Sequence, residues 1–216
     1  MILKRKPFPT PIVKLICKIT IWFHKRRFNK MVLFMADLKP NHSYLLMSNH
    51  FSFLDGVFAT YIWIYGLDKA TPIKGFYAMS LKQQLLKNKW LMWLGSFSIE
   101  PDSRSMVESL NYAAELLSTP GNAFLFYPQG ELESQHVRNI LLKKGFTKIL
   151  SKVACDCQLL WTSNIIEYFE STKPTINMHM LDCGTNKDFN FEDVQQKIDK
   201  HHQESIQKHI RFTKEA

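Results

Sequence analysis

The sequence predicts a single α/β domain with a mixed, largely parallel central sheet flanked by helices, and an amphipathic helix at the N-terminus. Segments with the pattern of strands alternate with segments with the pattern of helices along most of the chain. The 216 residues are enough for one well-buried domain and few for two. A hydrophobic content of 45%, including many aromatic residues, excludes a globally disordered chain.

The strands and helices follow in order from apolar runs and from the residues that end them. Strands are expected at residues 31–35, 44–47, 73–79, 97–99, 123–127, 159–166 and 176–181. Helices are expected at residues 53–65, 81–93, 105–117, 144–153 and 191–209. Gly66 is expected to end the first of these helices, and Ser103 to cap the third, which Pro120 and Gly121 terminate.

The first thirty residues differ in charge from the rest of the chain. The net charge is +9, and residues 1–30 contain nine Lys or Arg and no acidic residue. The remaining 19 basic residues balance all 19 acidic ones. We therefore divide the chain into a basic segment, 1–30, and a domain, 31–216. This distribution favours docking of the segment on an anionic surface.

Within this segment, apolar residues follow one helix face and lysines fall on another. The apolar set is Ile12, Leu15, Ile16, Ile19, Trp22 and Phe23. The pattern is typical of a helix in a membrane interface, because the apolar run is shorter than the roughly 20 residues that span a bilayer. A helix packed on the core with a solvated basic face is the alternative. Nucleic acid would accept the same charge, but the chain carries no recognition motif, so no nucleic-acid partner is expected.

The cysteines predict neither a disulfide scaffold nor a typical metal site. Four cysteines in a chain of this length lack the density of a secreted disulfide framework, so reduced thiols are expected. A metal could recruit Cys155, Cys157 and Cys183 together with His179, but Cys-x-Cys is not the usual zinc-knuckle spacing. We expect no metal.

A histidine and an aspartate occupy the junction between a predicted strand and the following helix. The segment reads Ser-Asn-His-Phe-Ser-Phe-Leu-Asp-Gly, with His50 and Asp55 separated by four residues. Loops at the C-terminal ends of strands carry the ligand sites of α/β sheets, so His50 could act as a general base oriented by Asp55. A capping box with Ser52 as the cap explains Ser52 and Asp55 without chemistry, but leaves Asn49 and His50 unexplained.

Two segments together resemble the glycerolipid acyltransferase family, whose best-known members are bacterial 1-acylglycerol-3-phosphate acyltransferases. The family's first block reads Asn-His-x-Ser-x-x-Asp in one of its forms, and residues 49–55 have this form. The third block is an apolar strand followed by Phe-Pro-Glu-Gly-Thr, to which Tyr127-Pro128-Gln129-Gly130-Glu131 is similar. The resemblance covers residues 48–180, and the order and spacing of the two blocks agree with the family.

The chain departs from the family's pattern at three places. Pro101 stands where the second block ends in arginine, and Arg104 lies nearby. Gln129 replaces the glutamate of the third block, and Glu131 follows the glycine in place of threonine. Residues 159–164 lack the proline of the fourth block. The altered blocks are those that position the acceptor, so the resemblance leaves the acceptor open.

The resemblance implies transfer of a fatty acyl group from a thioester, acyl-CoA or acyl-carrier protein, to a hydroxyl of a lipid such as a lysophospholipid, without a cofactor. His50 would be the general base and Asp55 its orienting partner, with main-chain amides around Gly130 as oxyanion donors. The substrate-binding residues would be Asn49, Ser52, Arg104, Pro128, Gln129, Gly130 and Glu131. Further cations for phosphate groups are Arg138, Lys143 and Lys144. The protein is expected on the cytoplasmic face of the membrane, peripheral or monotopic.

Other functions remain open at this stage. A lipid hydrolase would use His50 to activate water, but the Gly-x-Ser-x-Gly elbow that would favour it is absent from the sequence. A peripheral membrane-binding module with lost activity fits the altered blocks, as does acylation of an amphiphile other than a phosphatidate precursor.

Overall fold

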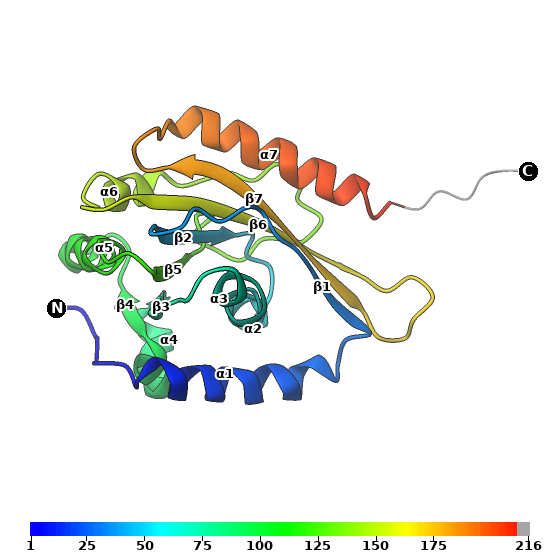
Figure 1. Cartoon of the computed structure of the whole chain (residues 1–216), viewed down its shortest axis with the longest axis horizontal. Helices are drawn as coiled ribbons and strands as arrows, with labels where there is room; N and C mark the ends of the chain where they lie inside the picture. Colours follow the sequence, from blue (N-terminus) through cyan, green and yellow to red (C-terminus); the bar gives the residue numbers. More distant parts are fainter. Residues whose placement is uncertain (211–216) are drawn as a thin grey trace, which may run out of the picture.

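The computed structural model describes residues 1–210 and shows a seven-stranded sheet with helices on both faces (Figure 1). The strands are β1 Lys30–Phe34, β2 Ser43–Ser48, β3 Gly75–Leu81, β4 Ser96–Ile99, β5 Asn122–Phe126, β6 Cys157–Glu167 and β7 Thr175–Thr185. The α-helices are α1 Thr10–Lys25, α2 Asp55–Ile62, α3 Asp68–Ala70, α4 Lys82–Lys87, α5 Arg104–Leu117, α6 Thr147–Leu150 and α7 Phe191–Gln207. A π-helical turn, η1, spans Trp63–Leu67, and 3-10 turns span Lys89–Leu94 (η2) and Lys144–Phe146 (η3).

The sheet is mixed and largely parallel, which confirms the predicted fold class. Its strand order is β1-β7-β6-β2-β5-β3-β4. All neighbouring strands described are parallel except β6 and β7, which form an antiparallel hairpin. The last strand, β7, lies between β1 and β6, so within the described sheet β1 pairs with β7 alone.

Two hydrophobic cores cover the two faces of the sheet, with β2 between them. Tyr44 and Leu46 belong to the core built with α1 and α2. Leu45 and Met47 belong to the core built with α5, α6 and α7. This is the period-2 alternation of a strand that is buried on both sides. Figure 1 shows α7 above the sheet and α1 and α2 below it. The end of β2 is therefore a rigid support for the loop that follows.

Gly66 does not end its helix, contrary to the sequence-based expectation. The helix continues from α2 through η1 and α3 as far as Ala70. A Cβ atom at Gly66 would lie 2.5 Å from Met35 Sδ and 2.8 Å from Leu33 Cδ2. Glycine lets the helix pack closely against the side chains of β1 and of the residue after it.

Other predicted helix bounds also need correction. The predicted helix 81–93 is divided at Asn88, whose side chain donates to the carbonyl of Gln84 and closes α4. The predicted helix 144–153 ends at Leu150. Ser103 is the N-cap residue of α5, but its hydroxyl donates to the carbonyl of Glu100 and makes no capping bond.

Helix α1 packs on the body of the protein through one face and exposes a second apolar face. Val13, Cys17 and Ile21 are buried. The exposed apolar stripe consists of Ile12, Leu15, Ile19, Trp22 and Phe23, with exposed fractions of 46–59%. The packed face fits a helix on the core, and docking of the exposed stripe on a membrane stays a prediction. None of the helices within residues 1–210 has the length and hydropathy of a membrane span.

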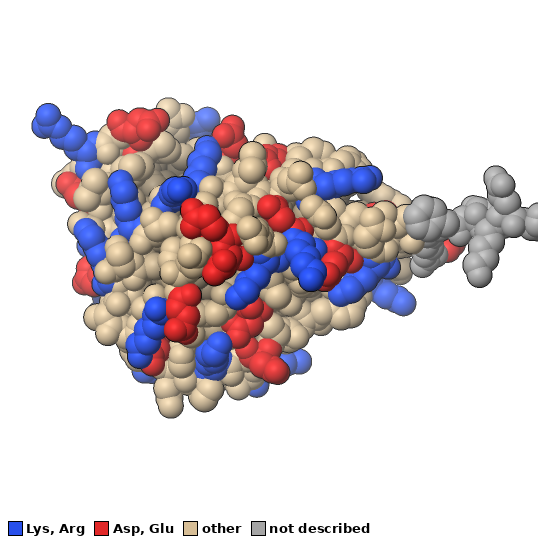
Figure 2. All heavy atoms as spheres, turned by 90° about the horizontal axis from the view of Figure 1, so that it is seen from above, with Lys and Arg blue, Asp and Glu red and all other residues tan. Residues whose placement is uncertain are grey.

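The charge on the opposite side of the molecule is mixed. Figure 2 shows the face over α7, where Lys and Arg side chains are interspersed with Asp and Glu. This agrees with the equal numbers of acidic and basic residues in 31–216. The excess positive charge of the chain belongs to its first thirty residues.

The cysteines are free thiols and do not gather around a metal position. Cys157 and Cys183 are buried, and burial raises the pKa of each thiol to about 12. Within residues 1–210, no group of three or more potential ligands is arranged to hold a metal ion. The alternative set that includes Cys155 and His179 therefore does not form a site in this part of the chain.

One face of α7 holds the irregular segment that follows the turn after β5. Gln195 Oε1 accepts a hydrogen bond from the Leu142 N–H at 2.9 Å. Asp199 Oδ1 accepts one from the Ile140 N–H at 2.6 Å. Residues four apart share a helix face, so one side of α7 satisfies main-chain groups that a neighbouring strand would satisfy in a sheet.

Candidate active site

The candidate site lies where two adjacent parallel strands end. Met47 of β2 pairs with Phe126 of β5. His50 lies three residues after Met47, and Gln129 lies three residues after Phe126, each in the loop that follows its strand. The register therefore brings the two sequence blocks together at one edge of the sheet, where α/β proteins bind ligands.

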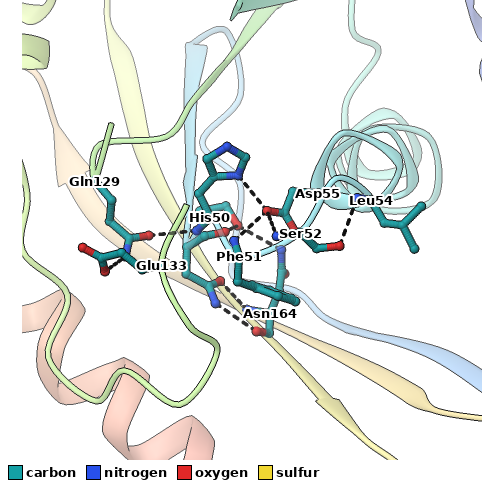
Figure 3. Close-up of polar contacts among 10 residues, drawn as sticks. His50, Phe51, Ser52, Leu54, Asp55, Gln129, Glu133 and Asn164 are labelled. Atoms are coloured by element: carbon teal, nitrogen blue, oxygen red, sulfur yellow. Dashed lines mark hydrogen bonds and ion pairs between the residues drawn. The ribbon is translucent and has the colours of Figure 1, made fainter. Parts of the chain in front are cut away.

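His50 and Asp55 are in direct contact. His50 Nδ1 lies 2.7 Å from Asp55 Oδ2, and the same oxygen accepts the main-chain N–H groups of Phe51 and Ser52 at 2.8 and 2.9 Å (Figure 3). The Asp55 side chain is 1% exposed and that of His50 is 27% exposed. A carboxylate only accepts hydrogen bonds, so Nδ1 carries the ring proton and Nε2 carries the free lone pair.

The Nε2 atom of this partly exposed ring is unpartnered within residues 1–210, and Figure 3 shows it facing away from Asp55. One ring face is stacked on Tyr127, with centroids 4.2 Å apart and planes 18° apart. The Tyr127 hydroxyl is buried, and burial together with the Asp55 charge raises the pKa of Tyr127 well above its usual range. Tyr127 is thus a neutral wall beside the imidazole.

Ser52 combines parts of both interpretations of the first block. Its Oγ accepts the Leu54 N–H at 3.1 Å, and its main-chain N–H donates to Asp55. The N-cap residue of α2 is Leu54, so Ser52 lies two residues before it and its bonds close the turn that leads into the helix. The capping and catalytic-pair interpretations are compatible, because one oxygen of Asp55 accepts both the loop amides and the imidazole.

Gln129 connects the second turn to the main chain of His50. Its Oε1 accepts the His50 N–H at 2.8 Å, and its Nε2 donates to the carboxylate of Glu133. The Glu133 N–H donates to the His50 carbonyl at 2.8 Å. Both main-chain polar groups of His50 are therefore bonded to residues 129–133. Glu133 lies outside both sequence blocks, and the sequence analysis missed it.

Asn49 bonds to β6, the strand on the other side of β2. Its Oδ1 accepts the Asn164 N–H at 2.8 Å, and its Nδ2 donates to the Asn164 carbonyl at 3.0 Å. Ser48 and Thr162 are the last paired residues of the two strands, so the amide of Asn49 extends their ladder beyond the end of β2. Asn49 is 4% exposed. Its amide thus joins two strands in place of the predicted contact with a substrate.

The turn after β5 is closed by Lys143. Its N–H donates to the Pro128 carbonyl at 2.8 Å, and its Nζ pairs with Glu131 at 2.9 Å. Gly130 has a φ of +78°, and a Cβ there would lie 3.0 Å from the Lys143 side chain. The Gly130 N–H donates to the Tyr127 carbonyl, so it is occupied. The Glu131 N–H has no partner within residues 1–210.

The other predicted cations do not contact His50. Arg104 begins α5 beyond β4, the edge strand three places from β2, and its side chain is exposed without a partner among the described residues. Arg138 is exposed, and Lys144 lies near an acidic residue of α7.

A cation that the sequence analysis missed lies at the same edge of the sheet. Lys82 follows β3 directly and pairs with Glu100 at 2.8 Å. This pairing lowers the pKa of the Glu100 carboxyl. The position of Lys82 immediately after a parallel strand is the signal that could have indicated it.

Comparison with known proteins identifies the family. A family model described as Acyltransferase matches residues 29–160, which is more than half of the chain. The chain belongs to the acyltransferase family. No curated protein matches it. The matched region of this acyltransferase contains both loops of the candidate site and ends before β7 and α7.

The fold of the acyltransferase is also found in a solved structure. The chain is similar to the crystal structure of the 1-acyl-sn-glycerophosphate (LPA) acyltransferase PlsC from Thermotoga maritima, with 16% identity and a TM-score of 0.54. The similar region covers 91% of this chain and 81% of that chain. This likeness supports a single α/β domain with a mostly parallel mixed sheet.

Proposed function

We propose that this acyltransferase moves a fatty acyl group from an acyl thioester to a hydroxyl of a lipid acceptor, with His50 as general base and Asp55 as its orienting partner. The observation that supports this most directly is the 2.7 Å contact between His50 Nδ1 and Asp55 Oδ2, which leaves Nε2 unpartnered on a partly exposed ring. An imidazole held in this tautomer is arranged to accept a proton at Nε2.

The proposed reaction proceeds through direct attack of the acceptor. Nε2 of His50 takes the proton of the acceptor hydroxyl as its oxygen bonds to the thioester carbonyl carbon. The C–S bond then breaks, and the departing thiolate takes the proton back from the imidazolium. Asp55 stabilises the imidazolium while it exists. The free N–H of Glu131 is the candidate donor to the oxyanion, because that of Gly130 is occupied.

The donor in this proposal is acyl-CoA or an acylated carrier protein, and the acceptor is a lysophospholipid or a related amphiphile. In this proposal the turn of Pro128, Gly130 and Glu131 would contact the substrates, and Arg104 and Lys82 would supply cations from the same edge of the sheet. Asn49, Ser52 and Gln129 are proposed as positioning residues, because their polar atoms are bonded to the main chain around His50.

We also propose that α1 docks the enzyme on an anionic membrane, at its cytoplasmic face. The exposed stripe that includes Leu15, Ile19 and Trp22 would lie among the acyl chains, and the basic residues around it would face the headgroups. A long-chain substrate is dissolved at that interface, so docking would bring the site to its substrate.

The reaction is tested with purified protein, palmitoyl-CoA and lysophospholipids, following thiol release and the acylated lipid together. We expect His50→Ala to lower kcat on the order of 10²- to 10⁴-fold. The control is His136→Ala, an exposed histidine with no side-chain bond among the described residues. Thiol release without an acylated acceptor would instead indicate a hydrolase. If the unmodified protein releases no thiol from any thioester, the acyltransferase proposal fails and a membrane-binding module is the remaining interpretation.

Docking is tested by cosedimentation with vesicles that contain anionic lipid. Burial of a Leu or Ile side chain contributes about 1.5–3 kcal/mol, so Leu15→Ser with Ile19→Ser should weaken vesicle binding on the order of tenfold or more. Val107→Ser, which replaces a half-exposed residue of α5, is the control and should bind normally. Equal binding of all three proteins would contradict docking through α1.

A further inference from the structure

Two residues of the second loop bond to the main chain of the proposed general base, Gln129 through its side chain and Glu133 through its main-chain N–H. Their side chains also bond to each other, and they differ in what they can donate. Gln129 faces a donor, the His50 N–H, and an acceptor, the Glu133 carboxylate, at the same time. The main-chain N–H only donates, and an ionised carboxylate only accepts. A primary amide is the group that satisfies both. The oxygen of Gln129 therefore faces His50 and its nitrogen faces Glu133.

The arrangement holds both polar groups of the His50 main chain. The His50 N–H is bonded to the Gln129 side chain, and the His50 carbonyl to the Glu133 N–H, each at 2.8 Å. Figure 3 shows Gln129 and Glu133 on the opposite side of His50 from Asp55. Asp55 fixes the imidazole, whereas this second pair fixes the backbone from which the imidazole projects.

We propose that Gln129 and Glu133 act as one positioning unit for His50, which requires an amide at one of the two positions and a carboxylate at the other. This inference rests on the proposed function, since it assigns the unit a role in placing the base of that reaction. Gln129 is 3% exposed, so a charge introduced there would be poorly screened by solvent. Neither residue touches the reacting atoms, and both act through the main chain of His50.

The proposal predicts a reciprocal effect of exchanging the two groups. Gln129→Glu places a second carboxylate against Glu133, and the two share a hydrogen bond only while one of them is protonated. Glu133→Gln keeps an oxygen that accepts from Gln129. In the double variant, Gln129→Glu with Glu133→Gln, the carboxylate at position 129 accepts the His50 N–H. The amide at position 133 donates to the same carboxylate. The double variant should therefore work better than the Gln129→Glu variant.

The experiment measures kcat and KM for thiol release from pH 6 to 9 in the unmodified enzyme, both single variants and the double variant. For Gln129→Glu, we expect kcat relative to the unmodified enzyme to fall as pH rises, reaching a loss on the order of 10- to 100-fold, with KM little changed. The double variant should recover to within roughly threefold and lose the pH trend. The control is Gln135→Glu, which adds the same charge to the same segment at a side chain that has no bond among the described residues. Its kcat relative to the unmodified enzyme should not change with pH.

Two results would overturn the inference: a Gln129→Glu enzyme as active as the unmodified one across this range, or a double variant as impaired as the single one. Hydrogen exchange of the His50 amide provides a second readout that needs no activity. At the high end of the pH range, this amide should exchange faster in Gln129→Glu than in the unmodified protein at the same pH. In the double variant its rate should return toward that of the unmodified protein. Inactivity of the unmodified protein would refute the proposed function, and the amide exchange would then decide the inference by itself.

Discussion

Replacement of Asn49 by alanine should destabilise the fold at the place where the proposed base is attached. The amide of Asn49 satisfies both the N–H and the carbonyl of Asn164, at 2.8 and 3.0 Å. Both side chains are nearly buried, at 4% and 2% exposed. Alanine would leave two buried main-chain groups without partners.

The magnitude follows from those two groups. Each buried polar group that loses its partner costs about 1–3 kcal/mol, which gives about 2–6 kcal/mol for the pair. Water that enters beside β2 would recover part of this, so we expect the lower half of that range. The loss should appear as a lower midpoint of urea unfolding with an unchanged m-value, because the folded state keeps its compactness.

The control for Asn49→Ala is Asn111→Ala, which removes an exposed amide that contacts Lys152. A surface change of this kind should alter the free energy of unfolding by less than about 0.5 kcal/mol. If Asn49→Ala is as mild as this control, the amide does not extend the ladder between β2 and β6, and the positioning role assigned to Asn49 is wrong. The kcat of Asn49→Ala should fall together with its stability, since His50 is the next residue.

Three further perturbations have defined expected outcomes. Gly66→Ala should destabilise the protein by about 1–3 kcal/mol in urea, because its methyl group would meet Met35, and Met35→Ala in the same chain should recover part of the loss. His179 has a pKa lowered to about 4 by burial and by the neighbouring His209 charge. The unfolded chain therefore binds more protons between pH 6.5 and 4, so stability falls as pH drops, and His179→Gln should reduce this loss by up to about 3 kcal/mol. Gln195→Ala should speed tryptic cleavage at Arg138, since it frees the segment that α7 holds.

Each of these has a matched control. Gly56→Ala adds the same methyl group to a helix where nothing lies within 4 Å, and it should not destabilise the protein. Leu132→Gln places a glutamine at an exposed position without a titratable group and should leave the pH slope of stability unchanged. Gln196→Ala changes the exposed neighbour of Gln195, and a cleavage rate equal to that of Gln195→Ala would show that α7 does not restrain the segment.

The strands that carry the site were predictable because their signal is local. β2 and β5 are apolar runs followed by polar turns, and the resemblance of the two blocks to the acyltransferase family implied that the turns belong together. The contacts of Asn164 and Glu133 depend instead on the register of strands distant in sequence. The local signal for Asn164 was the short polar stretch to which it belongs, within the otherwise apolar strand β6. Nothing local distinguished Glu133 from a solvated surface residue.

The errors in the helices have a common physical origin. A glycine after an apolar run is compatible with a helix end, but at Gly66 it reflects contact with another part of the chain. The periodicity of α1 left two interpretations open, because it does not show which apolar residues find a partner. Val13 and Ile21 pack on the core, while Leu15 and Ile19 of the predicted apolar face stay exposed. Such decisions depend on tertiary neighbours, which a single sequence does not display.

The position of β7 between β1 and β6 affects how the chain can fold while it is being synthesised. Strand β1 leaves the ribosome well before its sheet partner, which comes from residues 175–185. Contacts of such long sequence separation form slowly and leave unpaired strand edges exposed in the meantime. A nascent chain stalled before β7 would present β1 without its neighbour. We therefore expect such truncated chains to aggregate or to recruit chaperones, even though they already contain both loops of the candidate active site.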